Sequence, residues 1–218
     1  MILRHILLML TAATLLSSTA VAQHKNTPTT SITPQTLLER TEATLYRSGA
    51  TIVDFSTQLR DKSGRAAGAI TGKMHLQGDA FRLEYGSITA VYAAGTLTYY
   101  DSAEHTLTLS KPSQDELLQI NPLFFLRSRA AGFTSRIEGK PTATASVVFT
   151  PQHKSNVARI VATFQCSNGL PSQLVFTAKD KSLLTARITK VSSRAAYANT
   201  FFTLTAKQFP GCEVVDLR

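Results

Sequence analysis

From Thr51 onward, apolar and polar residues alternate with a period of two along most of the chain. This is the period of a half-buried strand, whose successive side chains point to opposite faces of a sheet. Short turns separate many of these segments, and short turns imply antiparallel neighbours. The predicted strands cover residues 51–60, 70–77, 81–85, 88–94, 97–101, 105–110, 132–137, 145–150, 157–166, 173–178, 184–191 and 200–206. The pattern predicts a mainly β protein with one large antiparallel sheet, which must curl to hide its apolar face.

Before the first strand, the spacing of apolar residues is helical. A helix is expected to begin near Pro34, with Thr33 as its N-cap and the proline in its first turn. Gly49 follows the last residue of this pattern and ends the helix. Its apolar face is formed by Leu37, Leu38, Thr41 and Leu45.

A second, shorter helix is predicted over residues 112–120. Ser113 and Glu116 have the spacing of a capping box, and the Asn-Pro pair at 121–122 stops the helix. The connector that follows, residues 123–126, is unusually apolar. Because it lies next to the apolar sheet face, this segment is predicted to be either a hinged cover of that face or an ordinary part of the core. The candidate lid residues are Leu117, Leu118, Ile120, Phe124 and Phe125.

One strand meander supplies the candidate lipid-binding residues, all of them apolar or aromatic. They are Phe81, Leu83, Tyr85, Leu97, Tyr99, Leu107 and Leu109. The alternative is that the same side chains pack against the lid as an ordinary core. An apolar sheet face with a cover nevertheless indicates a protein that binds a hydrophobic ligand.

Residues 1–22 have the layout of a cleavable signal peptide. Arg4 and His5 form a weakly basic start, residues 6–16 are apolar, and Ala20-Val21-Ala22 is an A-x-A cleavage site. The apolar run is too short to span a bilayer. Because the residue after the predicted cut is Gln23 rather than a lipid-bearing cysteine, the sequence predicts a soluble protein of the periplasm. Residues 23–33 read as a flexible leader and residues 34–218 as a single domain.

The charge of the chain is strongly positive, +9 over 218 residues. Two interpretations stand: attraction to anionic lipid headgroups or an acidic partner, or basic residues spread over solvated faces. Lysines and arginines are scattered, with no run of more than two. We expect no nucleic-acid partner.

No motif in the chain indicates catalysis. The histidines after the signal peptide, His24, His75, His105 and His153, lack metal-ligand spacing, and no G-x-S-x-G sequence occurs. We therefore expect no enzyme activity, no catalytic residues, no metal and no cofactor. Cys166 and Cys212 are the only cysteines. An oxidising compartment permits a bridge between them, and the alternative is two separate, small buried residues.

Several segments together resemble the LolA family of periplasmic outer-membrane lipoprotein carriers. They are the opening helix, the Gly72…Phe81-x-Leu-x-Tyr85 strand pair, the strand Gly95-Thr-Leu-Thr-Tyr-Tyr-Asp101, the helix Pro112-Ser-Gln-Asp-Glu-Leu-Leu-x-Ile-Asn-Pro122, and the ending Phe209-Pro-Gly-Cys-Glu-Val-Val-Asp-Leu-Arg218. The resemblance covers nearly the whole mature chain, although no single motif is diagnostic.

This resemblance implies an open, strongly curved antiparallel half-barrel of about 10–12 strands, of the LolA/LolB type, with short helices as a lid. It also implies a monomeric chaperone that carries lipoprotein acyl chains from an inner-membrane ABC-type exporter to an outer-membrane acceptor. The chain departs from the family in two places. The arginine of the family's K-R-P-x-x-F segment is absent from residues 76–81, and Thr98 stands where the family has tryptophan.

These departures keep two other functions open. One is a carrier of a different amphiphile, such as a glycolipid or a lipid ester, in the same fold. The other is a periplasmic adaptor that binds a partner protein without lipid.

Overall fold

Twelve strands form one open sheet in the part of the chain that the computed structural model describes, residues 31–113, 116–117, 120–121, 123–127 and 130–218. In chain order they are β1 (Ala50–Arg60), β2 (Ile70–Gln77), β3 (Ala80–Tyr85), β4 (Ile88–Ala93), β5 (Thr96–Asp101), β6 (Thr106–Ser110), β7 (Phe133–Glu138), β8 (Thr144–Pro151), β9 (Val157–Gln165), β10 (Pro171–Ala178), β11 (Leu183–Arg194) and β12 (Glu213–Leu217). The predicted signal peptide and all but the last residues of the predicted leader lie outside the described residues.

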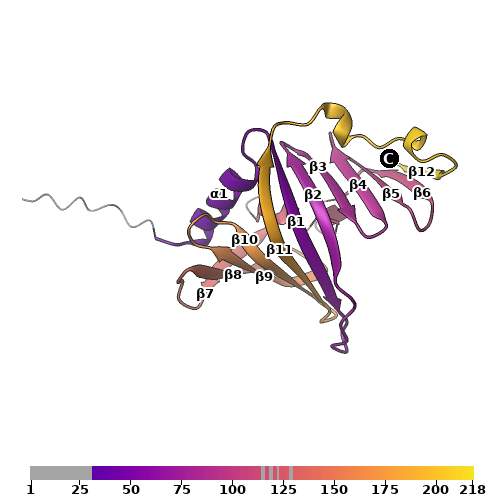
Figure 1. Cartoon of the computed structure of the whole chain (residues 1–218). Coiled ribbons are helices and arrows are strands. Elements are labelled where there is room, and N and C mark those ends of the chain that lie inside the picture. The colour runs from indigo at the N-terminus through magenta and orange to yellow at the C-terminus, as the bar shows by residue number, and fades with distance from the viewer. Residues whose placement is uncertain (1–30, 114–115, 118–119, 122, 128–129) are drawn as a thin grey trace, which may run out of the picture. The chain divides into compact units, whose positions relative to one another are not determined.

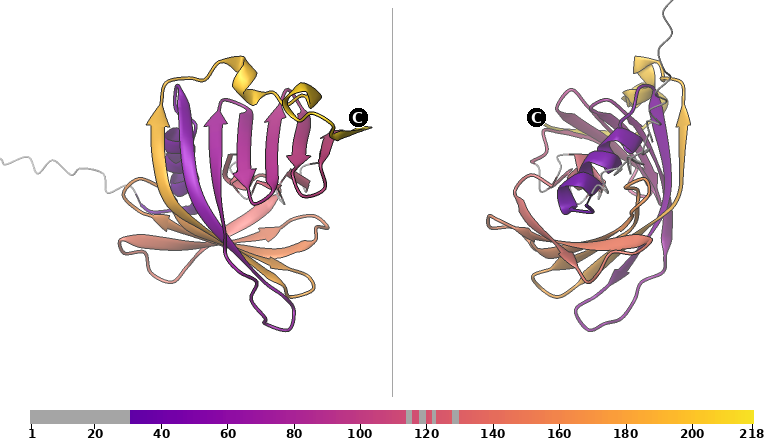
Figure 2. Two further views of the ribbon diagram at one scale, coloured as in Figure 1. Left: turned by 45° about the vertical axis from the view of Figure 1, so that its right-hand side comes forward. Right: turned by 90° about the vertical axis from the view of Figure 1, so that its left-hand side faces the viewer.

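The order of strands across the sheet is β12-β6-β5-β4-β3-β2-β1-β11-β10-β9-β8-β7. Two local meanders, β1 to β6 and β7 to β11, are therefore joined where β1 pairs with β11. Neighbouring strands are antiparallel except at one edge, where β12 runs parallel to β6. The sheet curls strongly without closing into a barrel (Figures 1 and 2), which confirms the predicted open, curved architecture.

The curled sheet has two faces with different covers. The concave face carries the main core, to which alternate residues of the central strands contribute, such as Val53, Met74 and Leu83. The convex face carries the residues between them, such as His75 and Arg82. Because a strand alternates strictly, the pairing register assigns each side chain of the meander to one face.

Helix α1 (Pro34–Leu45) lies within the curve of the sheet (Figure 2) and begins as the sequence predicts. The Thr33 hydroxyl accepts a hydrogen bond from the backbone N–H of Thr36, whose own side chain accepts one from the Thr33 backbone N–H. The predicted apolar face is buried against the core. The helix is also fixed to the β9–β10 turn, because Arg40 donates to the carbonyl oxygen of Cys166 at 2.5 Å and the buried Thr41 donates to that of Gly169.

The second predicted helix is described only in part. The Ser113 backbone N–H donates to the Glu116 carboxylate at 2.7 Å, and the Glu116 N–H reaches the Ser113 hydroxyl at 3.3 Å, which confirms the predicted capping box. Glu116, Leu117 and Ile120 are helical, and Leu118 lies outside the described residues. The apolar connector after it contains a further short helix, α3 (Phe124–Arg127), which the sequence pattern did not predict.

Residues 195–212 run over the convex face as a segment that we call the C-terminal strap. The prediction of a strand over residues 200–206 is wrong: the strap holds two 3-10 turns, η1 (Asn199–Phe202) and η2 (Ala206–Gln208). Phe202 and Leu204 do alternate, and both are buried on the convex face in a second apolar cluster with Val91 and Leu107. The strap lies across the face instead of beside an edge, so its backbone has no strand to pair with.

The possible disulfide bridge is also not formed, since Cys166 and Cys212 are both free thiols. Cys166 follows β9 and packs against the main core, whereas Cys212 precedes β12 and packs in the convex cluster. Eight strands lie between β9 and β12 in the sheet order. Because each strand adds about 4.8 Å, the two residues are far beyond the roughly 7 Å between Cα atoms that a disulfide spans.

Candidate functional site: the covered concave face

Five of the seven candidate lipid-binding residues lie together on the concave face. Phe81, Leu83 and Leu97 are buried in the main core, and Tyr85 and Tyr99 are partly buried against it. The cross-strand register explains this placement, because Leu83 pairs through Ala90 with Tyr99 along one row. The alternation read from the sequence therefore placed these five side chains correctly.

Leu107 and Leu109 lie on the other face, which corrects their grouping with the rest. Leu107 pairs with Tyr100 and Leu109 with Thr98, so both leucines point away from Leu97. They pack in the convex cluster beneath the strap. The pairing register of β6 with β5 puts Leu107 and Leu109 on the face opposite to the one expected. The alternation within a single strand does not reveal a one-residue shift of register.

The candidate lid residues that the structure describes pack on the concave face. Leu117 and Phe125 are buried in the main core, and Ile120 and Phe124 pack against it. Asn121, although polar, is 1 % exposed, and its side-chain oxygen accepts the backbone N–H groups of Leu123 at 2.9 Å and Phe124 at 3.2 Å. These two hydrogen bonds begin α3 and fix the turn between the two short helical segments.

Aromatic contacts hold the described part of the lid against the sheet. Phe124 and Tyr92 meet edge to face with ring centroids 6.2 Å apart, and Phe125 sits between Phe133 at 5.1 Å and Phe149 at 4.7 Å. The contacts that hold these two side chains are thus apolar.

Under the lid, the described residues contain a gap of about 10 Å³ between Phe55, Met74, Leu123, Ala186 and Ile188. Ligand pockets usually measure about 300–1,000 Å³, so this gap alone is too small for a lipid chain.

Near one end of β2, a glycine lies opposite an aromatic residue of β1, and this pairing of a small with a large residue opens space in the sheet surface. The Phe55 ring lies over Gly72, where an added Cβ would come within 2.4 Å of the ring, and stacks on Tyr85 with ring centroids 6.0 Å apart. The hydroxyl groups of Tyr85 and Thr57 share a hydrogen bond. Gly72, which entered the sequence analysis only through the family resemblance, has no side chain. The Phe55 ring can therefore lie across β2 at this point.

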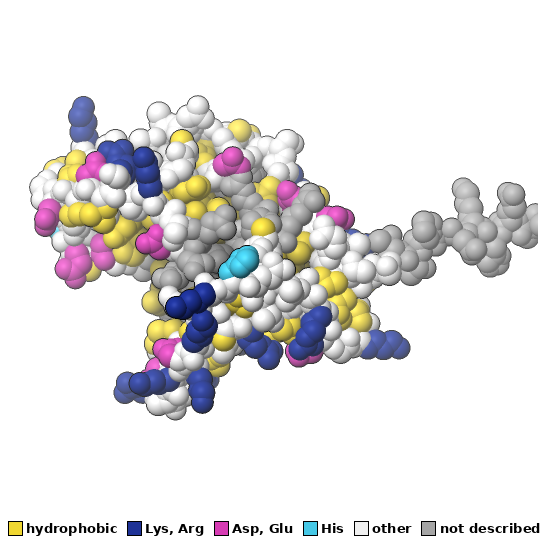
Figure 3. Space-filling model, turned by 180° about the vertical axis from the view of Figure 1, so that it is seen from behind, with side chains coloured by type: hydrophobic (Ala, Val, Ile, Leu, Met, Phe, Trp, Pro, Cys, Tyr) yellow, Lys and Arg dark blue, Asp and Glu magenta, His cyan; other side chains and the backbone are white. Residues whose placement is uncertain are grey.

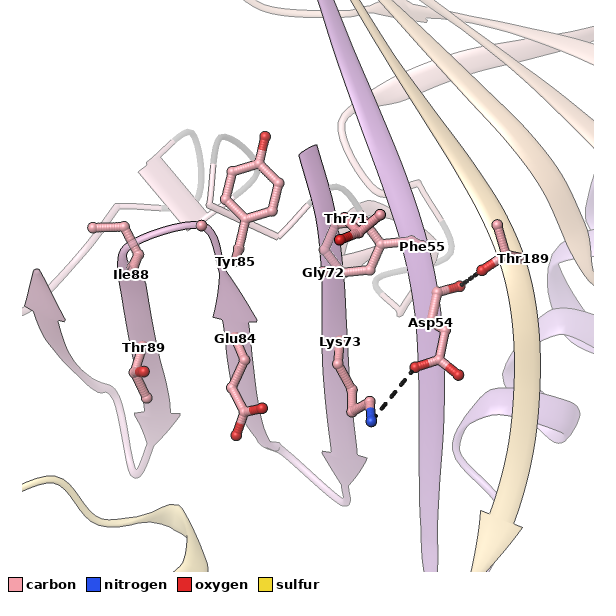
Figure 4. A pocket seen from close by; sticks show the side chains of 11 residues that line it. Asp54, Phe55, Thr71, Gly72, Lys73, Glu84, Tyr85, Ile88, Thr89 and Thr189 are labelled. Atoms are coloured by element: carbon pink, nitrogen blue, oxygen red, sulfur yellow. Dashed lines mark hydrogen bonds and ion pairs between the residues drawn. The ribbon is translucent and has the colours of Figure 1, made fainter. Parts of the chain in front are cut away.

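Next to this crossing lies an open hollow of about 570 Å³ at the rim of the sheet (Figure 4). Its polar side contains Asp54 and Lys73, 3.9 Å apart, and its apolar side includes Tyr85 and Ile88. The hollow touches residues of both alternating rows because β3 ends here at a turn. Phe55, Tyr85 and Ile88 line the hollow and also belong to or pack against the concave core, so the hollow adjoins the concave face.

The candidate lipid-binding residues predicted from the sequence leave out the half of the concave wall that the second meander supplies. Its buried side chains include Phe149, Ile160, Phe164 and Leu174. The alternation of apolar and polar residues in residues 145–178 is the signal that places them on this face.

The convex face holds a polar latch for the strap. His75 is 8 % exposed, and its Nδ1 lies 2.6 Å from the hydroxyl of Tyr197, whose ring stacks on Phe201 at 3.8 Å. Burial lowers the pKa of His75 below its ordinary value of 6.5, and the cations of β2, β3 and β11 act in the same direction. The opposing carboxylate is Glu84, and the three cations are Lys73, Arg82 and Arg194.

Acidification is therefore expected to loosen the strap. A lowered pKa means that the folded protein favours neutral His75, so its stabilising contribution is complete above pH 6.5 and decreases as the pH falls below that value. Hydrogen exchange of residues 197–217 at pH 7.5 and pH 5.0 measures the effect. His75→Phe should weaken the pH dependence, whereas His153→Gln, in an exposed loop, should leave it intact. An equal pH dependence in His75→Phe would contradict the latch.

Within the described residues, no group of three or more His, Cys, Asp or Glu side chains is placed to hold a metal ion. Across the same residues, no helix combines the length and apolar character needed to cross a membrane.

Comparison with known proteins bears on the fold. No family model matches the chain, and no curated protein is similar in sequence. An uncharacterized conserved protein from Thermus thermophilus aligns with a TM-score of 0.53 and 16% identity over 84% of this chain and 98% of that chain. A DUF1329 family protein from Desulfovibrio piger aligns with a TM-score of 0.50 and 10% identity over 79% of this chain and 97% of that one.

A LolA superfamily protein from Nitrosomonas europaea aligns with a TM-score of 0.49 and 8% identity, over 80% of this chain and 99% of that one. At these identities the likeness to the Thermus thermophilus and Desulfovibrio piger proteins shows the fold alone, an open and curved, mainly antiparallel sheet, which is the architecture that the sequence resemblance implied.

Proposed function

We propose that this chain is a periplasmic carrier that shields the acyl chains of lipoproteins between the inner and outer membranes. The observation that carries the proposal is the apolar concave face, on which the side chains of a short helical lid are packed. Transfer of an acyl chain into water costs about 0.8 kcal/mol per CH₂, so a sixteen-carbon chain costs on the order of 12 kcal/mol. An apolar face that exchanges lid side chains for acyl chains removes most of this barrier.

Several features of the lid support this reading over that of an ordinary core. Its helical segments are short, its described side chains pack on the sheet through apolar contacts, and the hydrogen bonds that the Asn121 side chain accepts stay within the lid itself. Opening the lid would leave these Asn121 bonds intact. An inner-membrane ABC-type exporter and an outer-membrane acceptor are the partners this function requires. No catalytic residue takes part.

The cargo is tested by uptake of a fluorescent fatty-acid probe and its displacement by competitors. We expect a diacylated lipopeptide to displace the probe at lower concentration than a glycolipid or a lipid ester. A reversed order would assign the fold to the other amphiphile. Absence of probe uptake by the wild-type protein would contradict the carrier function and favour the lipid-free adaptor.

Two neighbouring substitutions on β4 locate the uptake. Ile88 packs against the concave core and Thr89 faces the convex side, and both are half-buried. Ile88→Asp places a charge on the apolar face, which is unfavourable by several kcal/mol, so probe uptake should fall more than tenfold. Thr89→Asp adds the same charge to the other face and should leave uptake nearly unchanged. Equal losses in two folded variants would remove the concave face as the binding site.

A further inference from the structure

One end of the sheet gathers basic residues that are scattered in the sequence. The β1–β2 hairpin projects beyond the other strands (Figure 1), and the β10–β11 turn lies beside it, since Arg60 pairs with Leu183 and Lys62 acts on the Asp180 carboxylate. The β8–β9 loop joins them, because the Lys179 backbone N–H donates to the carbonyl oxygen of Asn156 at 3.0 Å. We call this end the basic rim. Its exposed cations are Arg60, Lys62, Arg65, Lys154, Lys179 and Lys181.

Two carboxylates in the same turns offset little of this charge. Asp61 lies 3.3 Å from Arg65 and also accepts hydrogen bonds from Ser63, so it shapes its own turn. Asp180 likewise accepts the Ser182 backbone N–H at 2.9 Å. In the part of the chain that the structure describes, the three lysines at 154, 179 and 181 form no salt bridge. Six cations against two carboxylates leave the basic rim with four positive charges in excess.

Exposed apolar side chains lie on the same hairpin. Among the described residues, the large hydrophobic side chains that are exposed are Leu59 at 50%, Ile70 at 43%, Val214 and Leu217. Leu59 and Ile70 both follow the concave alternation of their strands, since Ile70 pairs with the concave Thr57. They extend the apolar concave surface outward, next to the basic rim. Figure 3 shows lysine and arginine side chains around this lower end, with hydrophobic side chains between them.

We propose that the basic rim docks on the surface of an anionic lipid bilayer, with Leu59 and Ile70 entering the headgroup region. Cations approach an anionic leaflet favourably, and exposed apolar side chains add binding by leaving water. This pairing of a basic surface with exposed leucine and isoleucine favours a membrane over an acidic protein, which needs only the charges. Docking by this end brings the rim of the concave face to the lipid surface. It requires no particular cargo and stands apart from the proposed function.

Hydrogen bonds within the β1–β2 hairpin keep its tip ordered in water. The Arg60 guanidinium donates to the carbonyl oxygen of Gly64 at 2.7 Å, and the Ala67 N–H donates to that of Leu59 at 2.8 Å. These bonds order the tip although most of its side chains are exposed. An ordered tip loses little conformational freedom on docking.

The test is cosedimentation of the full-length folded protein with vesicles. We expect binding to vesicles of 30 mol% phosphatidylglycerol in phosphatidylcholine (about 0.05 M salt), little binding to pure phosphatidylcholine, and release at about 0.5 M salt. The triple variant Lys62→Gln/Lys179→Gln/Lys181→Gln should bind roughly 100-fold more weakly. Its control, Lys111→Gln/Lys140→Gln/Lys207→Gln, removes three exposed cations elsewhere and should bind within a few-fold of wild type.

The apolar part is tested with Leu59→Ser/Ile70→Ser, which should lower vesicle binding roughly tenfold. Val214→Ser/Leu217→Ser removes two exposed apolar residues from β12 and should have no effect. Equal losses in both lysine triples would reduce the effect to net charge and overturn the proposal. Binding to soluble polyglutamate as tight as to vesicles, and indifferent to Leu59→Ser/Ile70→Ser, would replace the membrane by an acidic partner. Normal vesicle binding by a protein without probe uptake would leave docking intact and remove only the carrier function.

Discussion

Replacing Gly169 with alanine should lower the free energy of unfolding by about 4 kcal/mol. Gly169 is buried in the β9–β10 turn with φ +72°, and an added Cβ would lie 2.4 Å from the Arg40 Cβ and 2.9 Å from both the Leu37 oxygen and the Thr41 nitrogen. Overpacking usually costs about 1–3 kcal/mol, and a strained backbone costs about as much again. Because two of these atoms belong to the backbone of α1 and the third is the first side-chain carbon of Arg40, the helix must move away from the turn.

Urea unfolding measures this effect, and Gly139→Ala is its matched control. Gly139 has nearly the same backbone angle, φ +76°, in the β7–β8 turn, with no atom within 4 Å of an added Cβ. Gly139→Ala should lower the free energy of unfolding by only about 1–2 kcal/mol, which is the cost of the strained backbone alone. Equal losses in both variants would show that α1 does not press on Gly169.

Replacing Phe125 with alanine should have two opposite effects. The side chain is 1 % exposed and anchors the lid between Phe133 and Phe149, so its loss should lower stability by about 3–5 kcal/mol. If lid and acyl chain compete for the concave face, the same loss makes the open state easier to populate. Affinity for a fatty-acid probe should then rise, by up to roughly 100-fold.

Phe202→Ala provides the control for Phe125→Ala. Phe202 is also a buried phenylalanine, but it belongs to the convex cluster under the strap. It should destabilise the protein without raising probe affinity, which is measured by fluorescence titration. A destabilised Phe125→Ala with unchanged probe affinity would mean that the lid is ordinary core.

Most of the architecture followed from local patterns in the sequence. The alternation found eleven of the strands and the face of five candidate lipid-binding residues, and the N-cap at Thr33 placed α1. What failed depended on distant partners. Whether Leu107 faces inward is decided by its register against Tyr100, and whether residues 200–206 form a strand is decided by the availability of an edge. β12, the strand that does occupy the edge of β6, has no clear alternation of its own.

The seam between the two meanders also sets how this chain must fold. Each meander joins strands that are neighbours in sequence, so its hairpins can form early and locally. The pairing of β1 with β11 instead joins residues at least 123 positions apart, from Arg60 to Leu183, and closing so long a loop is entropically costly. Only then can the strap cross from β11 to β6 and add the final strand. We therefore expect slow, late-completing folding, in the millisecond-to-second range typical of non-local β pairing, with the extreme C-terminus the last part to become protected.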